Sequence, residues 1–311
     1  MSEIILVLVL AALPAYAWDD APKAMEDGYY RELYPSGETR RVVTYTNHEL
    51  NGPFNTFYRN GKVMGEGFFE NGRLEGKAIA YYPSGRTRFQ MHYHKGKLDG
   101  PAQSFYANGN LKQDVHYIKG ILEEVARDYR PDGSPQYERK YNYGALTGLA
   151  KEFSPQGNIL RTATFRKGIQ TGLIQEYNSD GKMIRSFEAF DGIPTGIVKE
   201  YATSGAVKAQ ARMNAEAEIT DGLRKEYYST GEVWREATFI KNQRQGIYRE
   251  FYPDRSLLIV GQFVDGKRQG LFKTFYQSGK LKSETKYEND VKVFNKTYDG
   301  FGNIDLGEFT K

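Results

Sequence analysis

The sequence repeats every 24 residues, and this period limits the possible fold more than any other feature. With the first residue of each repeat numbered 0, eleven repeats begin at residues 28, 52, 76, 100, 124, 148, 172, 196, 222, 246 and 270. Gly occupies position 0 in ten of them, the exception being Glu124, and position 9 in ten, the exception being Arg255. Such a chain is a stack of similar repeats, each in contact mainly with its neighbours.

Each repeat has the pattern of a β-hairpin. Positions 7 to 9 read PSG, ANG, PDG, PQG or SDG, and such tripeptides form a type I turn closed by a Gly bulge. If position 6 then pairs with position 10, position 5 faces 11 and position 1 faces 15. Positions 1, 5, 11, 15 and 17 would form one apolar face, with positions 4 and 14 on the other face. A second turn, usually containing Gly, is expected near position 20.

Aromatic residues recur at two positions of the repeat. Position 5 is aromatic in ten repeats and position 17 in nine. Because one hairpin is marginally stable in water, the repeats must stack, and we expect these aromatics to form the core.

The predicted fold is all-β: an elongated, coiled antiparallel sheet built from eleven β-hairpin repeats, an open solenoid-like meander. The expected parts are a signal peptide at 1–17, a lead-in at 18–27, the tandem repeats at 28–293 with an irregular repeat at 196–221, and a degenerate C-terminal cap at 294–311.

The stretch GKAIAYYPSGRTRFQMHYHKGKLDG, residues 76–100, carries the pattern G-x₄-[FY]-Y-x₂-G-x₇-[FY]-x₂-G-x₃-G. This pattern resembles the variant (type 2) MORN repeat, and the likeness extends from residue 28 to about residue 302. Free-standing bacterial arrays of this type resemble the antitoxin family named after YwqK. That resemblance implies a protein that binds and neutralises a toxin.

Residues 4–13, IILVLVLAAL, followed by Ala-Tyr-Ala, are typical of a signal peptide cleaved after Ala17. The run is too short to span a bilayer, and the alternative is an apolar strand that caps the repeats. We therefore expect an exported protein, periplasmic or secreted. With no Cys, the chain has neither a Cys-linked lipid anchor nor a disulfide.

The charge is mild, with 43 Lys and Arg against 39 Asp and Glu. The basic runs are short, so the sequence predicts no nucleic-acid partner and gives only weak support for a membrane surface.

The sequence contains no motif for catalysis: no Cys nucleophile, G-x-S-x-G elbow, P-loop, H-E-x-x-H or Rossmann fingerprint. We expect neither an enzyme nor a cofactor. His92, His94 and His116 are weak candidates for zinc ligands, because an H-x-H pair has a third His one repeat away. Exposed polar surface explains these three residues equally well.

Position 6 offers the candidate binding residues. It is Tyr in seven repeats: Tyr34, Tyr58, Tyr82, Tyr106, Tyr228, Tyr252 and Tyr276. Tyr is frequent in interface hot spots, so these residues are candidate sites for a protein partner. Alternatively, each Tyr packs over its own turn and is structural.

The stretch 206–221 has a two-residue insertion and helix-favouring Ala, Glu, Gln and Lys, which is compatible with a short helix, a bulge or a hinge. Two functions remain open. One is an exported binding protein for a toxin or envelope protein, as in an immunity protein. The other is an envelope-binding module for glycan or lipid headgroups, or a structural scaffold.

We predict from the single layer of stacked hairpins that the chain is elongated in solution. Small-angle scattering should give a radius of gyration well above the roughly 19–20 Å of a compact domain of this length. A value near that of a compact domain would contradict the solenoid prediction.

Overall fold

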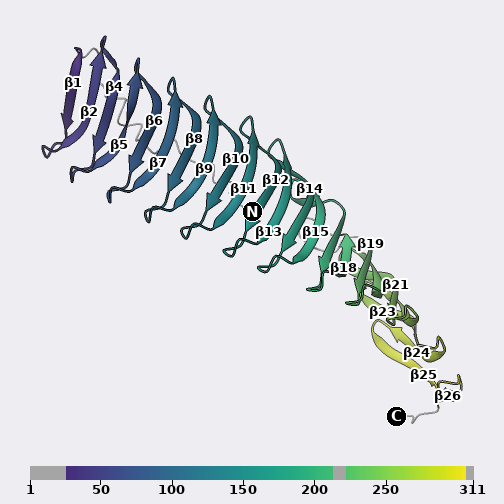
Figure 1. Cartoon of the computed structure of the whole chain (residues 1–311). Coiled ribbons are helices and arrows are strands. Elements are labelled where there is room, and N and C mark those ends of the chain that lie inside the picture. The colour runs from purple at the N-terminus through teal and green to yellow at the C-terminus, as the bar shows by residue number, and fades with distance from the viewer. Residues whose placement is uncertain (1–25, 213–221, 306–311) are drawn as a thin grey trace. The chain divides into compact units, whose positions relative to one another are not determined.

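The computed structural model describes residues 26–212 and 222–305, and these contain strands and turns but no helix (Figure 1). The chain divides into two compact halves. The N-terminal half holds residues 1–158 and 166–168, and the C-terminal half holds residues 159–165 and 169–311. The predicted all-β class is confirmed.

The strands of the N-terminal half are β1 (Gly28–Leu33), β2 (Thr39–Thr46), β3 (Glu49–Leu50), β4 (Gly52–Phe57), β5 (Val63–Glu70), β6 (Arg73–Tyr81), β7 (Thr87–His94), β8 (Lys97–Phe105), β9 (Leu111–Ile118), β10 (Ile121–Tyr129), β11 (Pro135–Asn142) and β12 (Ala145–Phe153). Consecutive strands pair antiparallel, except that the short β3 and the longer β4 both pair with β2. The result is an open meander.

The strands of the C-terminal half are β13 (Ile159–Arg166), β14 (Ile169–Tyr177), β15 (Met183–Phe190), β16 (Ile193–Pro194), β17 (Ile197–Tyr201), β18 (Val207–Arg212), β19 (Gly222–Tyr227), β20 (Val233–Ile240), β21 (Gln243–Phe251), β22 (Leu257–Val264), β23 (Lys267–Phe275), β24 (Leu281–Glu288), β25 (Val291–Tyr298) and β26 (Ile304–Asp305). From β14 onwards the described strands pair antiparallel in sequence order, with β16 and β17 both paired to β15.

The predicted turn at positions 7 to 9 is confirmed. In the repeat that starts at residue 52, the Tyr58 amide donates to the Lys62 carbonyl at 2.8 Å, and the Gly61 amide donates to the Tyr58 carbonyl at 2.9 Å. Gly61 has a φ of 79°, and Arg255, the one residue that replaces this Gly, still adopts a φ of 69°. The turn is therefore formed even where its preferred residue is missing.

The second turn is a two-residue loop of type I′. Asn71 and Gly72 have φ values of 49° and 72°, and the flanking residues Glu70 and Arg73 pair with each other. Two residues with positive φ match the right-handed twist of a hairpin, which explains the Gly expected near position 20.

The predicted faces of the hairpin are partly wrong because each repeat contains a one-residue bulge. In the first repeat, Leu33 pairs with Thr39 as expected, but Glu32 pairs with Arg41, so the residue at position 12 has no partner in the register. This extra residue places positions 5 and 11 on one face and positions 2, 4, 13, 15 and 17 on the other. Position 1 therefore pairs with 16, not 15.

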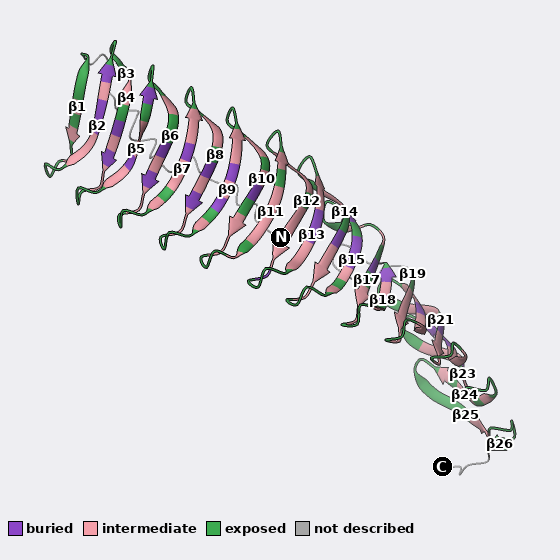
Figure 2. Cartoon of the chain, viewed as in Figure 1, coloured by how far each residue is buried: buried purple, intermediate pink, exposed green. Residues whose placement is uncertain are grey.

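Buried residues alternate with less buried ones along many strands (Figure 2). The core lies on the face that carries positions 2, 15 and 17. Phe54, Met91 and Ile174 are almost completely buried there, with exposed fractions of 1%, 1% and 0%. The prediction for position 17 is supported by Tyr45, Phe69 and Phe263, which are all buried. Position 5 is not in this core: its aromatics, such as Phe153, are half-buried on the opposite face.

The Gly at position 0 lies where each strand is bulged. Opposite β5, Phe68 pairs with Glu75 and Glu66 with Ile79, so the three residues 76–78 face a single residue. Gly76 has a φ of 70° at this point, and Glu124, the one exception at position 0, has a φ of 63°. The backbone conformation, not the side chain, is what the repeat requires here.

Side-chain volumes complement one another across the core. A Cβ atom added at Gly261 would lie 2.3 Å from Phe272 Cδ1, and one at Gly67 would lie 2.7 Å from Phe54 Cε1. At these two places a Gly at position 15 leaves room for a position-2 ring, which belongs to the same repeat for Gly67 and to the next repeat for Gly261. In the C-terminal half the rings also meet edge to face: the centroid of Phe263 lies 5.7 Å from that of Phe272.

We predict that Gly261→Ala destabilises the protein by about 1–3 kcal/mol, because the new methyl group overlaps the Phe272 ring. Equilibrium denaturation of the purified variant measures this loss. Phe272→Leu in the same chain should recover part of it. Gly300→Ala is the control, since its added Cβ meets no atom within 4 Å. Equal stability of the Gly261 variant and the parent would contradict the packing.

Candidate interaction surfaces

The seven position-6 tyrosines connect successive repeats. Each donates its hydroxyl to the main-chain carbonyl of the aromatic residue that ends the corresponding strand of the next repeat. The acceptors lie at 2.7–3.0 Å and are Phe57, Tyr81, Phe105, Tyr129, Phe251, Phe275 and Tyr298. We call these residues the tyrosine ladder. All seven rings are half-buried, and burial raises the pKa of the Tyr58 hydroxyl.

The repeats without Tyr at position 6 show what the ladder supplies. Arg130 occupies the position and donates to the carbonyls of Phe153 and Ser154, so the link to the next repeat is kept by another side chain. Ser154 is buried and accepts from the Asn158 amide within its own turn. The contacts therefore give the tyrosine ladder a structural role, while the exposed part of each ring remains available for binding.

Cations cover several of these rings. The guanidinium carbon of Arg59 lies 5.5 Å from the Tyr34 ring centroid, and that of Arg88 lies 5.6 Å from the Tyr82 ring centroid. Such contacts are worth about 0.5–1 kcal/mol at exposed sites. A partner that stacked on these rings would first displace a cation.

The three histidines do not form a ligand group. His94 Nδ1 lies 2.9 Å from Glu75 Oε1, and His92 Nδ1 lies 3.2 Å from the Pro101 carbonyl oxygen. His116 pairs with Pro101 in the register of β8 and β9. Within residues 26–212 and 222–305, no three or more His, Cys, Asp or Glu side chains are placed to hold a metal ion.

The irregular stretch is a strand as far as it is described. Residues 207–212 form β18, which pairs with β17 and β19 and buries Ala209 and Ala211. The helix allowed by its composition is wrong for this part, because pairing on both edges outweighs propensity. The remainder, 213–221, lies outside the described residues, as do the expected signal peptide and its cleavage site after Ala17.

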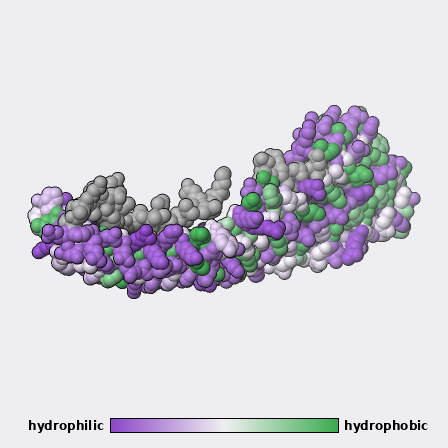
Figure 3. Space-filling model, turned by 90° about the horizontal axis from the view of Figure 1, so that it is seen from above, coloured by the Kyte–Doolittle hydropathy of each residue, from purple (hydrophilic) through white to green (hydrophobic). Residues whose placement is uncertain are grey.

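A row of exposed aliphatic side chains runs across the C-terminal half at position 1. It consists of Leu173, Ile197, Leu223, Ile247 and Leu271, each 43–52% exposed. We call it the aliphatic stripe. Because of the bulge at position 12, position 1 lies on the face opposite the core. The predicted place of these residues in the core is therefore wrong. In the space-filling view, hydrophobic residues are more frequent over the C-terminal strands (Figure 3).

Charged residues border the aliphatic stripe on the same face. Glu236, at position 14, lies 3.0 Å from Arg249 Nη1 and 3.8 Å from Lys225 Nζ, both cations being at position 3. Lys273 and Glu284 repeat the arrangement at 3.3 Å. Aliphatic and charged side chains therefore share this face, as they do in many non-obligate protein interfaces.

A hollow of about 320 Å³ opens on this face beside the turn of the repeat that starts at residue 222. Its lining comprises Gly231, Glu232, Val233, Glu236, Phe251 and Arg255. The hollow has an apolar wall in Phe251 and charged walls in Glu236 and Arg255, so it suits one amphipathic side chain of a partner.

In the N-terminal half, a position-5 tyrosine bonds to the position-14 residue of the preceding repeat. The Tyr81 hydroxyl donates to Glu66 Oε1 at 2.6 Å, and burial together with this bond raises the pKa of Tyr81 to about 12. The hydroxyl therefore stays protonated at neutral pH and acts as a hydrogen-bond donor.

No described helix is long and apolar enough to cross a membrane.

Comparison with known proteins supports the repeat assignment. The MORN repeat variant matches residues 50–71, 98–119, 220–241 and 268–289. These four segments share the frame of the 24-residue period, which confirms that the repeats are of the MORN variant type at these places. No curated protein matches the chain.

Two solved structures are similar to the chain at low identity. They are titled "Crystal Structure of TcdB2-TccC3-Cdc42" and "Crystal Structure of TcdB2-TccC3", with identities of 13% and 12% and TM-scores of 0.19 and 0.17. The similarity covers 88% and 89% of this chain but only 19% and 18% of those chains. TM-scores this low do not define a shared arrangement.

We predict that Tyr82→Phe costs about 0.5–1.5 kcal/mol of stability, because the Phe105 carbonyl loses its hydroxyl donor while the ring remains. Chemical denaturation measures the change. Tyr177→Phe is the matched control, since the Tyr177 hydroxyl makes no hydrogen bond to a described residue; its effect should stay below about 0.5 kcal/mol. Equal effects of the two substitutions would show that the tyrosine ladder does not link the repeats through its hydroxyls.

Proposed function

We propose that this chain is a non-catalytic binding protein that recognises a protein partner through the aliphatic stripe. The observation that carries the proposal is the exposure of five aliphatic side chains, one in every second strand of the C-terminal half. On the intervening strands, polar side chains pair with these residues on the same face: Glu188, Arg212, Thr238, Gln262 and Lys286. A surface that mixes aliphatic and polar side chains is typical of a non-obligate protein interface.

The geometry of the stripe suits a macromolecule better than a small ligand. Equivalent residues lie two strands apart, about 9.6 Å, so five of them extend over roughly 38 Å. A contact of that length is on the scale of a standard protein interface. The neighbouring ion pairs of Lys225, Glu236 and Arg249 provide the polar border, and the hollow beside Phe251 provides a place for an anchoring side chain.

The proposal of a non-catalytic role rests on how the reactive groups are used. The hydroxyls of the tyrosine ladder are hydrogen-bonded to main-chain carbonyls, and the carboxylates of the stripe border pair with cations. No sequence motif supplies a nucleophile with its base.

In its finer form the proposal is that the partner is a toxin and that the exported chain neutralises it by covering its surface. The resemblance of the repeats to the YwqK-like antitoxin family supports this form, and the apolar run 4–13 supports export.

The test is capture of a partner by the full chain from native envelope extract, compared with Leu223→Lys/Ile247→Lys. Each charge would replace an aliphatic contact with the partner and lose its hydration, so the variant should bind at least about tenfold more weakly. Its stability should change by less than about 1 kcal/mol, since both residues are half exposed. Ile240→Lys is the matched control, because Ile240 is also exposed, at 46%, but lies outside the stripe.

Undiminished binding by the folded double variant would overturn the assignment of the stripe. The toxin form is tested by expressing the captured protein alone and together with the chain. Growth arrest that the parent chain relieves, and the double variant does not, is the expected result. Capture of lipid vesicles instead of a protein would favour the envelope-binding alternative.

A further inference from the structure

The core face contains one charged residue at position 2. The residues at this position are Tyr30, Phe54, Ala78, Ala102, Ala126, Ala150, Ile174, Val198, Arg224, Tyr248 and Phe272. Arg224 therefore stands where ten other repeats place an apolar side chain. A guanidinium in a core position is costly unless charged groups compensate for its desolvation.

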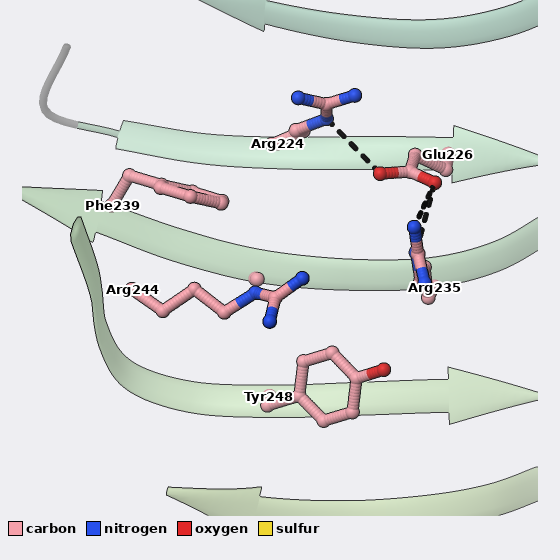
Figure 4. Close-up of a pocket in the computed structure, with 7 residues that line it drawn as sticks. Arg224, Glu226, Arg235, Phe239, Arg244 and Tyr248 are labelled. Carbon is pink, nitrogen blue, oxygen red and sulfur yellow. Dashed lines mark hydrogen bonds and ion pairs between the residues drawn. The ribbon is translucent and has the colours of Figure 1, made fainter. Parts of the chain in front are cut away.

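Two further arginines, Arg235 and Arg244, lie on the neighbouring strands (Figure 4). Arg224 and Glu226 lie on β19, Arg235 on β20 and Arg244 on β21, and all four line one cavity of about 10 Å³. Ala237, Phe239 and Tyr248 complete the walls. We call this cavity the arginine pocket.

The carboxylates near the arginine pocket are already engaged. Arg235 Nη2 lies 2.7 Å from Glu226 Oε2, and Arg224 Nε lies 3.1 Å from Glu226 Oε1. That Arg224 contact lacks hydrogen-bond geometry, and this buried nitrogen has no hydrogen-bond partner among the described residues. Glu250, across from Arg235 in the register, accepts from the Tyr248 hydroxyl.

Arg244 is left without a carboxylate among the described residues. Its guanidinium carbon lies 5.8 Å from the Tyr248 ring centroid and 5.4 Å from that of Phe263, and these ring contacts hold it in place. Arg268 occupies the equivalent position one repeat later and does have an acid: its Nε lies 2.9 Å from Asp290 Oδ1. The pocket therefore holds three guanidinium groups around one carboxylate, with unused donors on Arg224 and Arg244.

We propose that the arginine pocket binds a carboxylate group. A cavity of about 10 Å³ admits a group the size of a water molecule, which fits one carboxylate oxygen. Guanidinium donors match carboxylates in geometry and charge. The side chains of Arg224 and Arg235 are each 30% exposed, so the ligand reaches them from solvent.

The carboxylate comes either from a partner protein, as an Asp or Glu side chain, or from a free small acid. The pocket lies on the face opposite the aliphatic stripe, because positions 1 and 2 point to opposite sides of the sheet. This inference is therefore independent of the proposed function, and either can fail alone.

The test follows the side-chain Nε–H signals of ¹⁵N-arginine-labelled full chain by NMR. Sodium acetate is titrated at constant ionic strength of roughly 0.1 M with chloride as the balancing anion. The signals of Arg224 and Arg244 should shift and saturate in the millimolar range. Arg244→Gln should weaken binding at least tenfold, whereas Arg268→Gln, which removes the paired equivalent, should leave it unchanged.

A second arm uses a blocked peptide with a single Glu. Saturable shifts with the peptide support a protein partner as the source, and shifts with acetate alone support a free small acid. The proposal is overturned if neither ligand gives saturable shifts in the parent, if chloride produces the same shifts as acetate, or if Arg244→Gln, shown to be folded by its melting curve, binds as the parent does.

Discussion

Each half of this protein is a sheet of paired hairpins whose core has to be made by the sheet itself, and the one-residue bulge at position 12 makes that possible. The bulge moves positions 2, 15 and 17 to one face, where Phe54, Met91 and Ile174 reach nearly complete burial. The two extra residues at Gly76 bulge the strand again. Without these bulges, period-2 alternation would place position 17 on the face of position 5 and opposite position 2. The core would then be divided between the two faces of the sheet.

The turns were predictable from sequence because their chemistry is local. Gly at position 9 and at position 20 reports a positive φ, and the hydrogen bonds of Tyr58 show the expected geometry. Two non-Gly residues are instructive: Arg255 at position 9 and Glu124 at position 0 keep φ values of 69° and 63°, so stacking with neighbouring repeats enforces a conformation that these residues disfavour.

The two faces of each hairpin could not be predicted, because no residue type in the repeat marks the bulge at position 12. Position 1 was assigned to the core from its apolar character, yet Ile197 and Ile247 are about half exposed at 52% and 51%. For the same reason, Arg224 could not be recognised from the sequence as a residue of the core face. It is unusual because Phe54, Val198 and Tyr248 occupy the same position in other repeats and are buried. The position-6 tyrosines were found as a pattern, but the carbonyl that each hydroxyl reaches lies 22 or 23 residues away and follows from stacking.

Departures from the repeat separate residues that serve the fold from residues that are free to serve binding. At position 6, Arg130 replaces Tyr and still reaches the Phe153 carbonyl, whereas Ser154 and Asn178 accept from amides within their own turns. At position 1, by contrast, the N-terminal half carries Tyr29, Pro53, Lys77 and Pro101 before the aliphatic Val125 and Leu149, with no change in strand pairing. A position that tolerates Lys and Pro in one half does not need Leu or Ile for folding in the other, and an aliphatic row exposed to water has no stabilising role of its own. The stripe is therefore free of a folding role and is available to the proposed partner.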